Sequence, residues 1–93
     1  MDNYQEAHDK CIKLIQQKKN IILLGSGNNG KTFLINNIIE NLREYHIFHE
    51  FDNIILNLIN TDKPFITAIN TLDTIKHIDS DLYQIIDMNN IHY

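Results

Sequence analysis

The hydrophobic residues of this 93-residue chain form two kinds of segment: short continuous runs and longer runs with helical spacing. Residues 21–24 (IILL) are a continuous apolar run and residues 64–70 (PFITAIN) are strongly apolar, as is typical of strands buried inside a parallel sheet. Residues 46–52 (HIFHEFD), interrupted by two histidines, and residues 83–88 (YQIIDM) are also predicted to be strands. Residues 60–64 (NTDKP) have the composition of a turn.

Apolar residues spaced three or four positions apart predict helices between these strands. An amphipathic helix is expected over residues 3–18, where it would cover one face of the sheet. The helix after the first strand is expected to bury Leu34, Ile35, Ile38, Ile39, Leu42 and Tyr45. Shorter helices are expected over residues 53–60, capped by Asp52, and over residues 71–82. The last of these would have an apolar face of Leu72, Ile75, Ile78 and Leu82.

A helix followed by strands that alternate with helices predicts a parallel sheet with right-handed crossovers and helices on both faces. We therefore expect an α/β fold, a three-layer α-β-α sandwich with a four-stranded parallel sheet. Residues 21–24 should lie centrally, with 64–70 beside them, 46–52 beyond those, and 83–88 on the other side. Residues 1–93 should form one domain. Ligands of such sheets bind at the carboxyl ends of the strands.

Composition narrows the class of protein further. The net charge is -4 and the isoelectric point about 5.6, which argues against direct nucleic-acid binding because that needs an excess of cations. No apolar run is long enough to span a bilayer, and the single cysteine, Cys11, excludes an internal disulfide. An intracellular, cytoplasmic location is expected. The many isoleucines and asparagines fit an AT-rich genome, and for a virus the location would be the host cytoplasm or the virion.

Residues 25–32 (GSGNNGKT) match the pattern G-x-x-x-x-G-K-[ST] at every fixed position. A predicted strand precedes them and a predicted helix follows, which is the context that this motif requires. All three glycines of the chain lie here. Clustered glycines allow the backbone to approach an anion closely and to direct its N–H groups inward.

This pattern predicts a polyphosphate site. Lys31 would reach the β- and γ-phosphates, and the Thr32 hydroxyl would ligate Mg²⁺. The complete set of predicted binding residues is Gly25, Ser26, Gly27, Asn28, Asn29, Gly30, Lys31 and Thr32.

Residues 20–45 resemble the first strand, Walker A loop and first helix of P-loop NTPases. The ending NNGKT is similar to loops of viral and phage ATPases such as the superfamily 3 helicases. The strong resemblance covers about a quarter of the chain. It implies a minimal P-loop domain of the additional-strand ATPase branch, with ATP or GTP and Mg²⁺ as ligands.

ATPases of this family carry an Asp-Glu pair after an apolar strand, the Walker B motif. The nearest equivalent is HIFHEFD, in which His49 stands in place of the aspartate. The resemblance implies that Glu50 polarises the attacking water and that Asp52 assists the metal. The alternative, a surface glutamate and a helix cap, stays open. Asp87, at the end of YQIID, is a rival for the metal carboxylate.

The segment IN-TLD supports two further assignments by resemblance. In ATPases, Asn70 would act as sensor 1, which contacts the γ-phosphate or the attacking water. In GTPases, Asn70 and Asp73 would correspond to the guanine-selecting N-K-x-D motif, although Thr71 replaces its lysine and no D-x-x-G follows any strand. A third interpretation is that Thr71 or Asp73 only caps the next helix.

Two other candidates are weaker. Arg43 is the only arginine, so it would have to act in trans as an arginine finger; a surface ion pair with Glu40 or Glu44 is the simpler assignment. His46 and His49 should point to opposite faces of a strand, which argues against zinc.

Three functions follow from these observations. The first is Mg²⁺-dependent binding of a nucleoside triphosphate, with ATP as the first choice, and slow hydrolysis of its γ-phosphate. The second is a nucleotide-binding module without hydrolysis, and the third is a GTP-binding switch that uses Asn70 and Asp73. A protein partner or a homo-oligomer stays open in each case.

Overall fold

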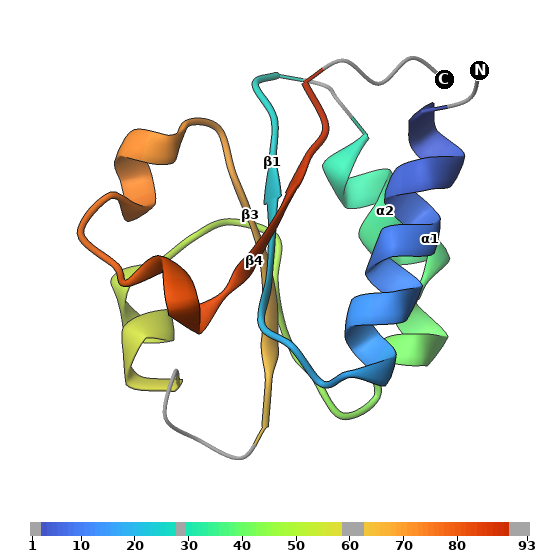
Figure 1. Ribbon diagram of the computed structural model, residues 1–93, viewed down its shortest axis with the longest axis horizontal. Coiled ribbons are helices and arrows are strands. Elements are labelled where there is room, and N and C mark those ends of the chain that lie inside the picture. Colours follow the sequence, from blue (N-terminus) through green and yellow to red (C-terminus); the bar gives the residue numbers. More distant parts are fainter. Residues whose placement is uncertain (1–2, 28–29, 59–62, 90–93) are drawn as a thin grey trace.

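The computed structural model describes residues 3–27, 30–58 and 63–89 of the chain. Its α-helices and strands are, in chain order (Figure 1), α1 (Asn3–Gln16), β1 (Ile21–Leu24), α2 (Lys31–Asn37), β2 (His46–Phe48), β3 (Phe65–Ile69) and β4 (Gln84–Asp87). Four 3-10 helices lie between them: η1 (Ile39–Leu42), η2 (Asn53–Leu58), η3 (Leu72–Ile75) and η4 (Ser80–Leu82). No helix in these residue ranges is long and apolar enough to cross a membrane.

The four strands form one parallel sheet in the order β2-β3-β1-β4. Ile21 of β1 pairs with Ile66 of β3 on one side and with Gln84 of β4 on the other. The predicted strand order and parallel direction are therefore confirmed. All four residues of β1 and all five of β3 are buried, as expected for central strands that are covered on both faces.

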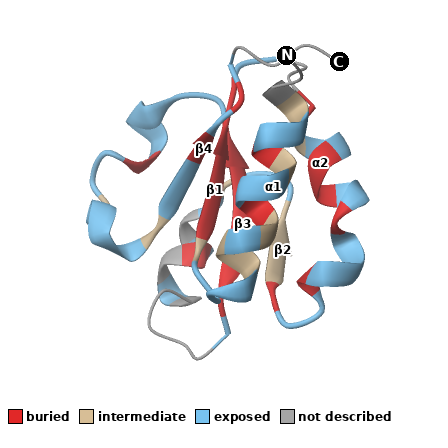
Figure 2. Cartoon of the chain, turned by 45° about the vertical axis from the view of Figure 1, so that its right-hand side comes forward, coloured by how far each residue is buried: buried red, intermediate tan, exposed pale blue. Residues whose placement is uncertain are grey.

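The first face of the sheet is covered by α1 and α2 (Figures 1 and 2). Strand residues alternate between the two faces, so Ile21 and Leu23 of β1 pack on this side. Cys11 lies fully buried among them, and burial raises the pKa of its thiol to about 12. The buried cluster consists of Ala7, Cys11, Ile21, Leu23, Leu34, Ile35, Ile38, Leu42, Tyr45, Ile66, Ala68, Ile86 and Met88.

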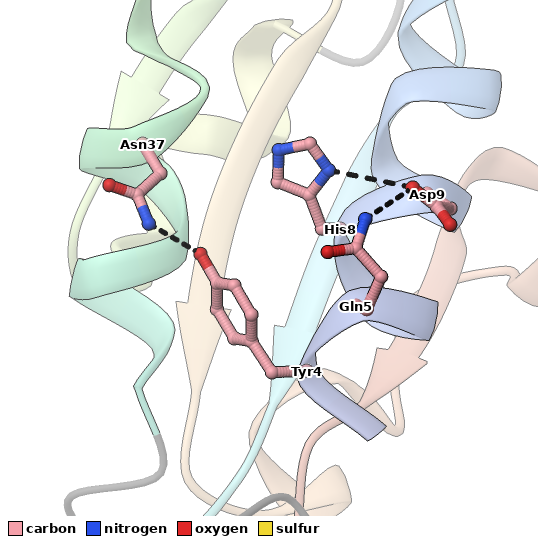
Figure 3. Close-up of polar contacts among 5 residues, drawn as sticks. All are labelled: Tyr4, Gln5, His8, Asp9 and Asn37. Atoms are coloured by element: carbon pink, nitrogen blue, oxygen red, sulfur yellow. Dashed lines mark hydrogen bonds and ion pairs between the residues drawn. The ribbon is translucent and has the colours of Figure 1, made fainter. Parts of the chain in front are cut away.

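Polar contacts accompany the packing of α1 (Figure 3). The Asn37 side chain donates a 2.6 Å hydrogen bond to the Tyr4 hydroxyl and so joins α2 to α1. Within α1, the Gln5 side chain donates to Asp9 at 2.9 Å, and the Nδ1 atom of His8 lies 3.7 Å from the same carboxylate. The Asn37–Tyr4 hydrogen bond therefore links the two helices on one face of the sheet, and the other two contacts lie within α1.

The second face is covered by 3-10 helices, so the arrangement is compatible with a three-layer α/β fold. Its buried cluster consists of Ile22, Leu24, Ile55, Phe65, Ile69 and Ile75. The prediction of one helix over residues 71–82 was wrong, because this segment forms η3 and η4, and Leu72 is 52% exposed. The physical reason is the density of Thr, Asp and Ser, whose side chains compete for backbone N–H groups. The Asp79 carboxylate, for example, accepts from Asp81 N at 3.0 Å.

The helix after the glycine-rich motif is shorter than expected. α2 ends at Asn37, and the Ile38 N–H is shared between the carbonyls of Leu34 and Ile35, both at 3.2 Å, where the chain tightens into η1. The apolar face is buried as predicted except for Ile39, which is 44% exposed. Asparagine and β-branched isoleucine are poor α-helix formers, which accounts for the early end.

The structure also tests the predicted bounds of two helices and the predicted cap of one of them. The Asp52 carboxylate accepts from Ile54 N at 3.1 Å, so the predicted cap of the following helix is confirmed. That helix is the 3-10 helix η2, which ends at Leu58, and the predicted continuation to residue 60 and most of the predicted turn lie outside the described residues. The first helix ends at Gln16, and Lys18 has a φ of 56°, a left-handed conformation that ends helices.

Candidate functional site

The glycine-rich motif leaves the carboxyl end of the central strand β1 and leads into α2. Gly25 N donates to the carbonyl of Ile69 at 3.0 Å, which ties the start of the loop to the end of β3. Gly27 and Gly30 have φ angles of 65° and 85°, in the region that glycine adopts without strain. The predicted binding residues Asn28 and Asn29 lie outside the described residues.

The Lys31 ammonium group is held over this loop. It donates to the carbonyl of Gly25 and, at 3.3 Å, to the carbonyl of Gly27. Partial burial removes water from the charged group, which lowers the pKa of Lys31 below its usual value of 10.5. The side chain therefore places a cation beside the Gly25 and Gly27 carbonyls.

A cleft of about 420 Å³ opens beside Lys31 at the carboxyl ends of β2 and β3. All three predicted catalytic residues, Lys31, Glu50 and Asn70, line it together. Lys31 begins α2, Glu50 follows β2 and Asn70 follows β3, and they meet because parallel strands all end at the same edge of the sheet. The full lining is Gly27, Lys31, His49, Glu50, Phe51, Ala68, Ile69, Asn70 and Thr74.

Other predicted site residues lie outside this lining. Thr32 is exposed in the first turn of α2, directly after Lys31. Asp52 is exposed and its carboxylate caps η2, while Asp73 is exposed in the first turn of η3. Asp87 ends β4 opposite Leu24, on the far side of β1 from β2 and β3, and its carboxylate accepts from Asn89 N at 2.9 Å.

No group of three His, Cys, Asp or Glu side chains that could hold a metal ion occurs within residues 3–27, 30–58 and 63–89. Protein side chains from this part of the chain therefore do not form a complete metal cage. A divalent ion that also takes phosphate oxygens and water as ligands needs fewer protein groups.

Two residues that sequence analysis missed border the site. Thr74 of η3 lines the cleft, and its position became clear only when the expected long helix proved to be a short turn. Asn89 accepts a 3.0 Å hydrogen bond from Ser26 N, although 63 positions separate the two residues. No sequence pattern marks Asn89.

A second hollow, of about 710 Å³, lies at the other end of the sheet, before the start of β3. Arg43 lines it, together with Ile15, Lys18, Glu40, Asn41, Glu44, Tyr45, Lys63 and Pro64. The prediction that Arg43 forms a surface ion pair was wrong, since neither Glu40 nor Glu44 lies within salt-bridge distance of Arg43 in the structure. The two hollows share no residue.

Comparisons with protein-family models, with curated proteins and with solved structures gave no match for this chain.

Proposed function

We propose that this chain is a minimal P-loop NTPase that binds a nucleoside triphosphate, with ATP as the first choice, together with Mg²⁺, and hydrolyses the γ-phosphate slowly. The observation that carries the proposal is the convergence of Lys31, Glu50 and Asn70 on one cleft beside a glycine-rich loop. A lysine that binds phosphates and a polar or acidic group that positions the attacking water are recurring parts of sites for phosphoryl transfer, together with Mg²⁺.

The loop and Lys31 would bind the phosphates. The ammonium group has three N–H donors, and carbonyl oxygens of Gly25 and Gly27 accept from it. Phosphate oxygens carry more negative charge than carbonyls and form stronger hydrogen bonds with a cation. The ammonium group would therefore turn toward a polyphosphate with only a small movement. Because α2 has only seven residues, the lysine contributes more to the attraction than the helix dipole does.

Two predicted residues would supply oxygen ligands for Mg²⁺. Thr32 is exposed beside Lys31, and Asp52 is exposed two positions after Glu50, which lines the cleft. One oxygen of the Asp52 carboxylate accepts the Ile54 N–H, which leaves the other oxygen for the ion or for one of its water ligands. Bound Mg²⁺ supplies positive charge that neutralises the phosphate oxygens.

Hydrolysis would depend on Glu50 and Asn70. The Glu50 carboxylate would accept a proton from the attacking water, and the Asn70 amide would orient that water or the terminal phosphate. The reaction should be slow, because the only arginine, Arg43, lines the hollow at the opposite end of the sheet. An arginine that stabilises the transition state would have to come from another molecule.

A nucleotide-binding module without hydrolysis is the second candidate. His49 lines the cleft at the position where related ATPases have the metal-binding aspartate, and this substitution favours binding over turnover. The GTP-binding switch depends on Asp73, which lies outside the lining of the cleft. Selection of guanine by Asp73 stays a prediction, to be tested with Asp73→Ala.

Thermal stability with and without nucleotide tests the proposal. MgATP at about one hundred times its Kd should stabilise the natural chain by about 2.7 kcal/mol, which raises Tm by on the order of 10 °C for a domain of this size. Lys31→Ala should abolish the shift, whereas Lys10→Ala, which removes an exposed lysine from α1, should preserve it. Equal shifts in the natural chain and Lys31→Ala, or no shift at all, would refute the proposal.

Phosphate release, measured in parallel, separates the two candidates. Slow release that Glu50→Gln abolishes supports hydrolysis. Stabilisation by MgATP without release supports the binding module. A GTP-specific shift that Asp73→Ala removes would support the GTP-binding switch.

A further inference from the structure

The start of the phosphate loop is attached to a residue that lies outside the motif. The backbone N–H of Ser26 donates to Oδ1 of Asn89 at 3.0 Å, and the Ser26 hydroxyl lies 3.5 Å from the same oxygen. Asn89 follows β4, on the opposite side of β1 from the cleft. This contact therefore holds the loop from the β4 side of the sheet, through a residue that does not belong to the motif.

Asn89 itself is held in place by its neighbours. Its backbone N–H donates to the Asp87 carboxylate at 2.9 Å. Met88, fully buried, donates its N–H to the carbonyl of Leu24 at 2.7 Å. Three consecutive residues after the centre of β4 therefore form a fixed array beside the end of β1.

The start of the loop has contacts on both sides. Gly25 N is bonded to the carbonyl of Ile69 in β3, and Ser26 N is bonded to Asn89 beyond β4. These two bonds set the direction in which the chain enters Gly27, whose carbonyl accepts from Lys31. A loop with glycines at its first and third positions loses much conformational freedom when it is ordered, so each such bond matters.

We propose that Asn89 is a positioning residue of the phosphate loop. By holding Ser26, it keeps Gly27 and Lys31 in the arrangement that receives a polyphosphate. This inference rests on the proposed function. It also means that Ser26 N–H supports the loop and does not bind phosphate, so that the binding amides begin at Gly27.

The same contacts give Asp87 a different role from the one considered in the sequence. Its carboxylate braces Asn89 and lies across β1 from the cleft. A metal carboxylate would have to face the terminal phosphates, on the side of Glu50 and Asn70. Asp87 therefore acts through Asn89.

Three variants test the positioning role. Asn89→Ala removes the acceptor, and Asn89→Asp keeps an acceptor oxygen but adds a negative charge near the phosphates. Asn41→Ala, an exposed asparagine in η1, serves as the matched control. MgATP affinity should be measured for each at low and high salt, relative to the natural chain at the same salt.

Asn89→Ala should raise the Kd for MgATP by about two- to tenfold, the size expected for one lost hydrogen bond, at both salt concentrations. Asn89→Asp should bind weakly at low salt and approach the natural chain at high salt, where its charge is screened. The Tm without nucleotide should change no more in Asn89→Ala than in Asn41→Ala. An unchanged Kd in Asn89→Ala, or an Asn89→Asp affinity that high salt does not restore, would overturn the proposal.

Amide hydrogen exchange at Ser26 provides a readout that does not need nucleotide. Exchange should be slower in the natural chain than in Asn89→Ala, and equal rates would show that the tether does not exist in solution. The two proposals fail in different ways. If Lys31→Ala abolishes MgATP binding and Asn89→Ala leaves it unchanged, only the positioning role is refuted. If the natural chain does not bind MgATP, both are.

Discussion

The two ends of the sheet differ more in chemistry than in size. The larger hollow, about 710 Å³, lies at the amino end of β3, and the smaller, about 420 Å³, lies at the carboxyl ends of β2 and β3. The larger one is lined by Lys18, Arg43 and Lys63 but also by Glu40 and Glu44, so its charges have both signs. The smaller one combines Lys31 with the glycine-rich loop.

The polar groups at the two ends also have different partners. At the amino end, the Tyr45 hydroxyl donates to the carbonyl of Lys19 at 2.6 Å, a bond that joins the segment before β2 to the segment between α1 and β1. At the carboxyl end, side chains from α2 and from the segments after β2 and β3 converge on one cleft. Volume alone would have selected the hollow at the amino end as the candidate site. The position of the smaller cleft, where the strand ends meet the glycine-rich loop, selects the carboxyl end instead.

The largest expected effect is on turnover at the carboxyl end. Glu50→Gln keeps the shape of the side chain but removes its ability to accept a proton. Phosphate release should fall by about 10²- to 10⁴-fold, the usual contribution of a general base, while the Kd for MgATP changes little. Single-turnover phosphate release checks this, and an unchanged rate would remove Glu50 from the mechanism.

Matched deletion of one cation at each end tests the comparison itself. Lys31→Ala should weaken MgATP binding on the order of 100-fold, because a partly desolvated ammonium group is lost from the phosphate site. Arg43→Ala should leave the Kd unchanged, since Arg43 lines the amino-end hollow. Calorimetric titration of both variants provides the measurement. A larger loss of MgATP affinity in Arg43→Ala than in Lys31→Ala would place the nucleotide in the amino-end hollow and contradict the proposal.

Alkaline pH should weaken MgATP binding at the carboxyl-end cleft. Burial lowers the pKa of Lys31 below 10.5, so the free protein loses this cation as pH rises toward 10.5. In the proposed site the cation binds the phosphates, so the affinity for MgATP should fall by up to about tenfold per pH unit above the lowered pKa. Lys31→Arg stays charged and should show a flatter profile wherever it binds. A decline of equal steepness in both proteins would show that Lys31 is not the titrating group.

The smallest effect is expected from the amino end. Tyr45→Phe removes the hydrogen bond to Lys19 and should lower the free energy of unfolding by about 0.5–1.5 kcal/mol at pH 7, with no change in MgATP affinity. Burial, then the nearby Cys11, raises the pKa of Tyr45 from 10.0 to about 12. The contribution of its neutral form is thus complete below pH 10 and is lost as pH rises through about 12. Urea unfolding at pH 7 and pH 11 checks both statements.

The sheet could be predicted because its strands are buried apolar runs. Ile21 to Leu24 and Phe65 to Ile69 have few alternatives to a central position, and the connections between them restrict the order. The 3-10 helices that cover the second face of the sheet could not be predicted. Leu72, Ile75, Ile78 and Leu82 have helical spacing, but the intervening Thr, Asp and Ser residues bond locally and break the segment into turns.

The candidate site likewise has residues that could be predicted from the sequence and residues that could not. Lys31, Glu50 and Asn70 were predicted to lie together because each follows the carboxyl end of a strand, or the loop after one, and those ends meet. Asn89 could not be predicted, since its contact with Ser26 depends on the register between β1 and β4. The cap formed by Asp52 could be predicted, because a carboxylate that precedes a helix accepts from the first N–H groups of that helix.

The most direct test is a crystal structure of the chain with Mg²⁺ and an ATP analogue that resists hydrolysis. The β- and γ-phosphates should lie over Gly27 and within hydrogen-bond distance of the Lys31 ammonium group, with the terminal phosphate directed toward Glu50 and Asn70. Nucleotide bound in the amino-end hollow beside Arg43, or phosphates without contact to Lys31, would contradict the account.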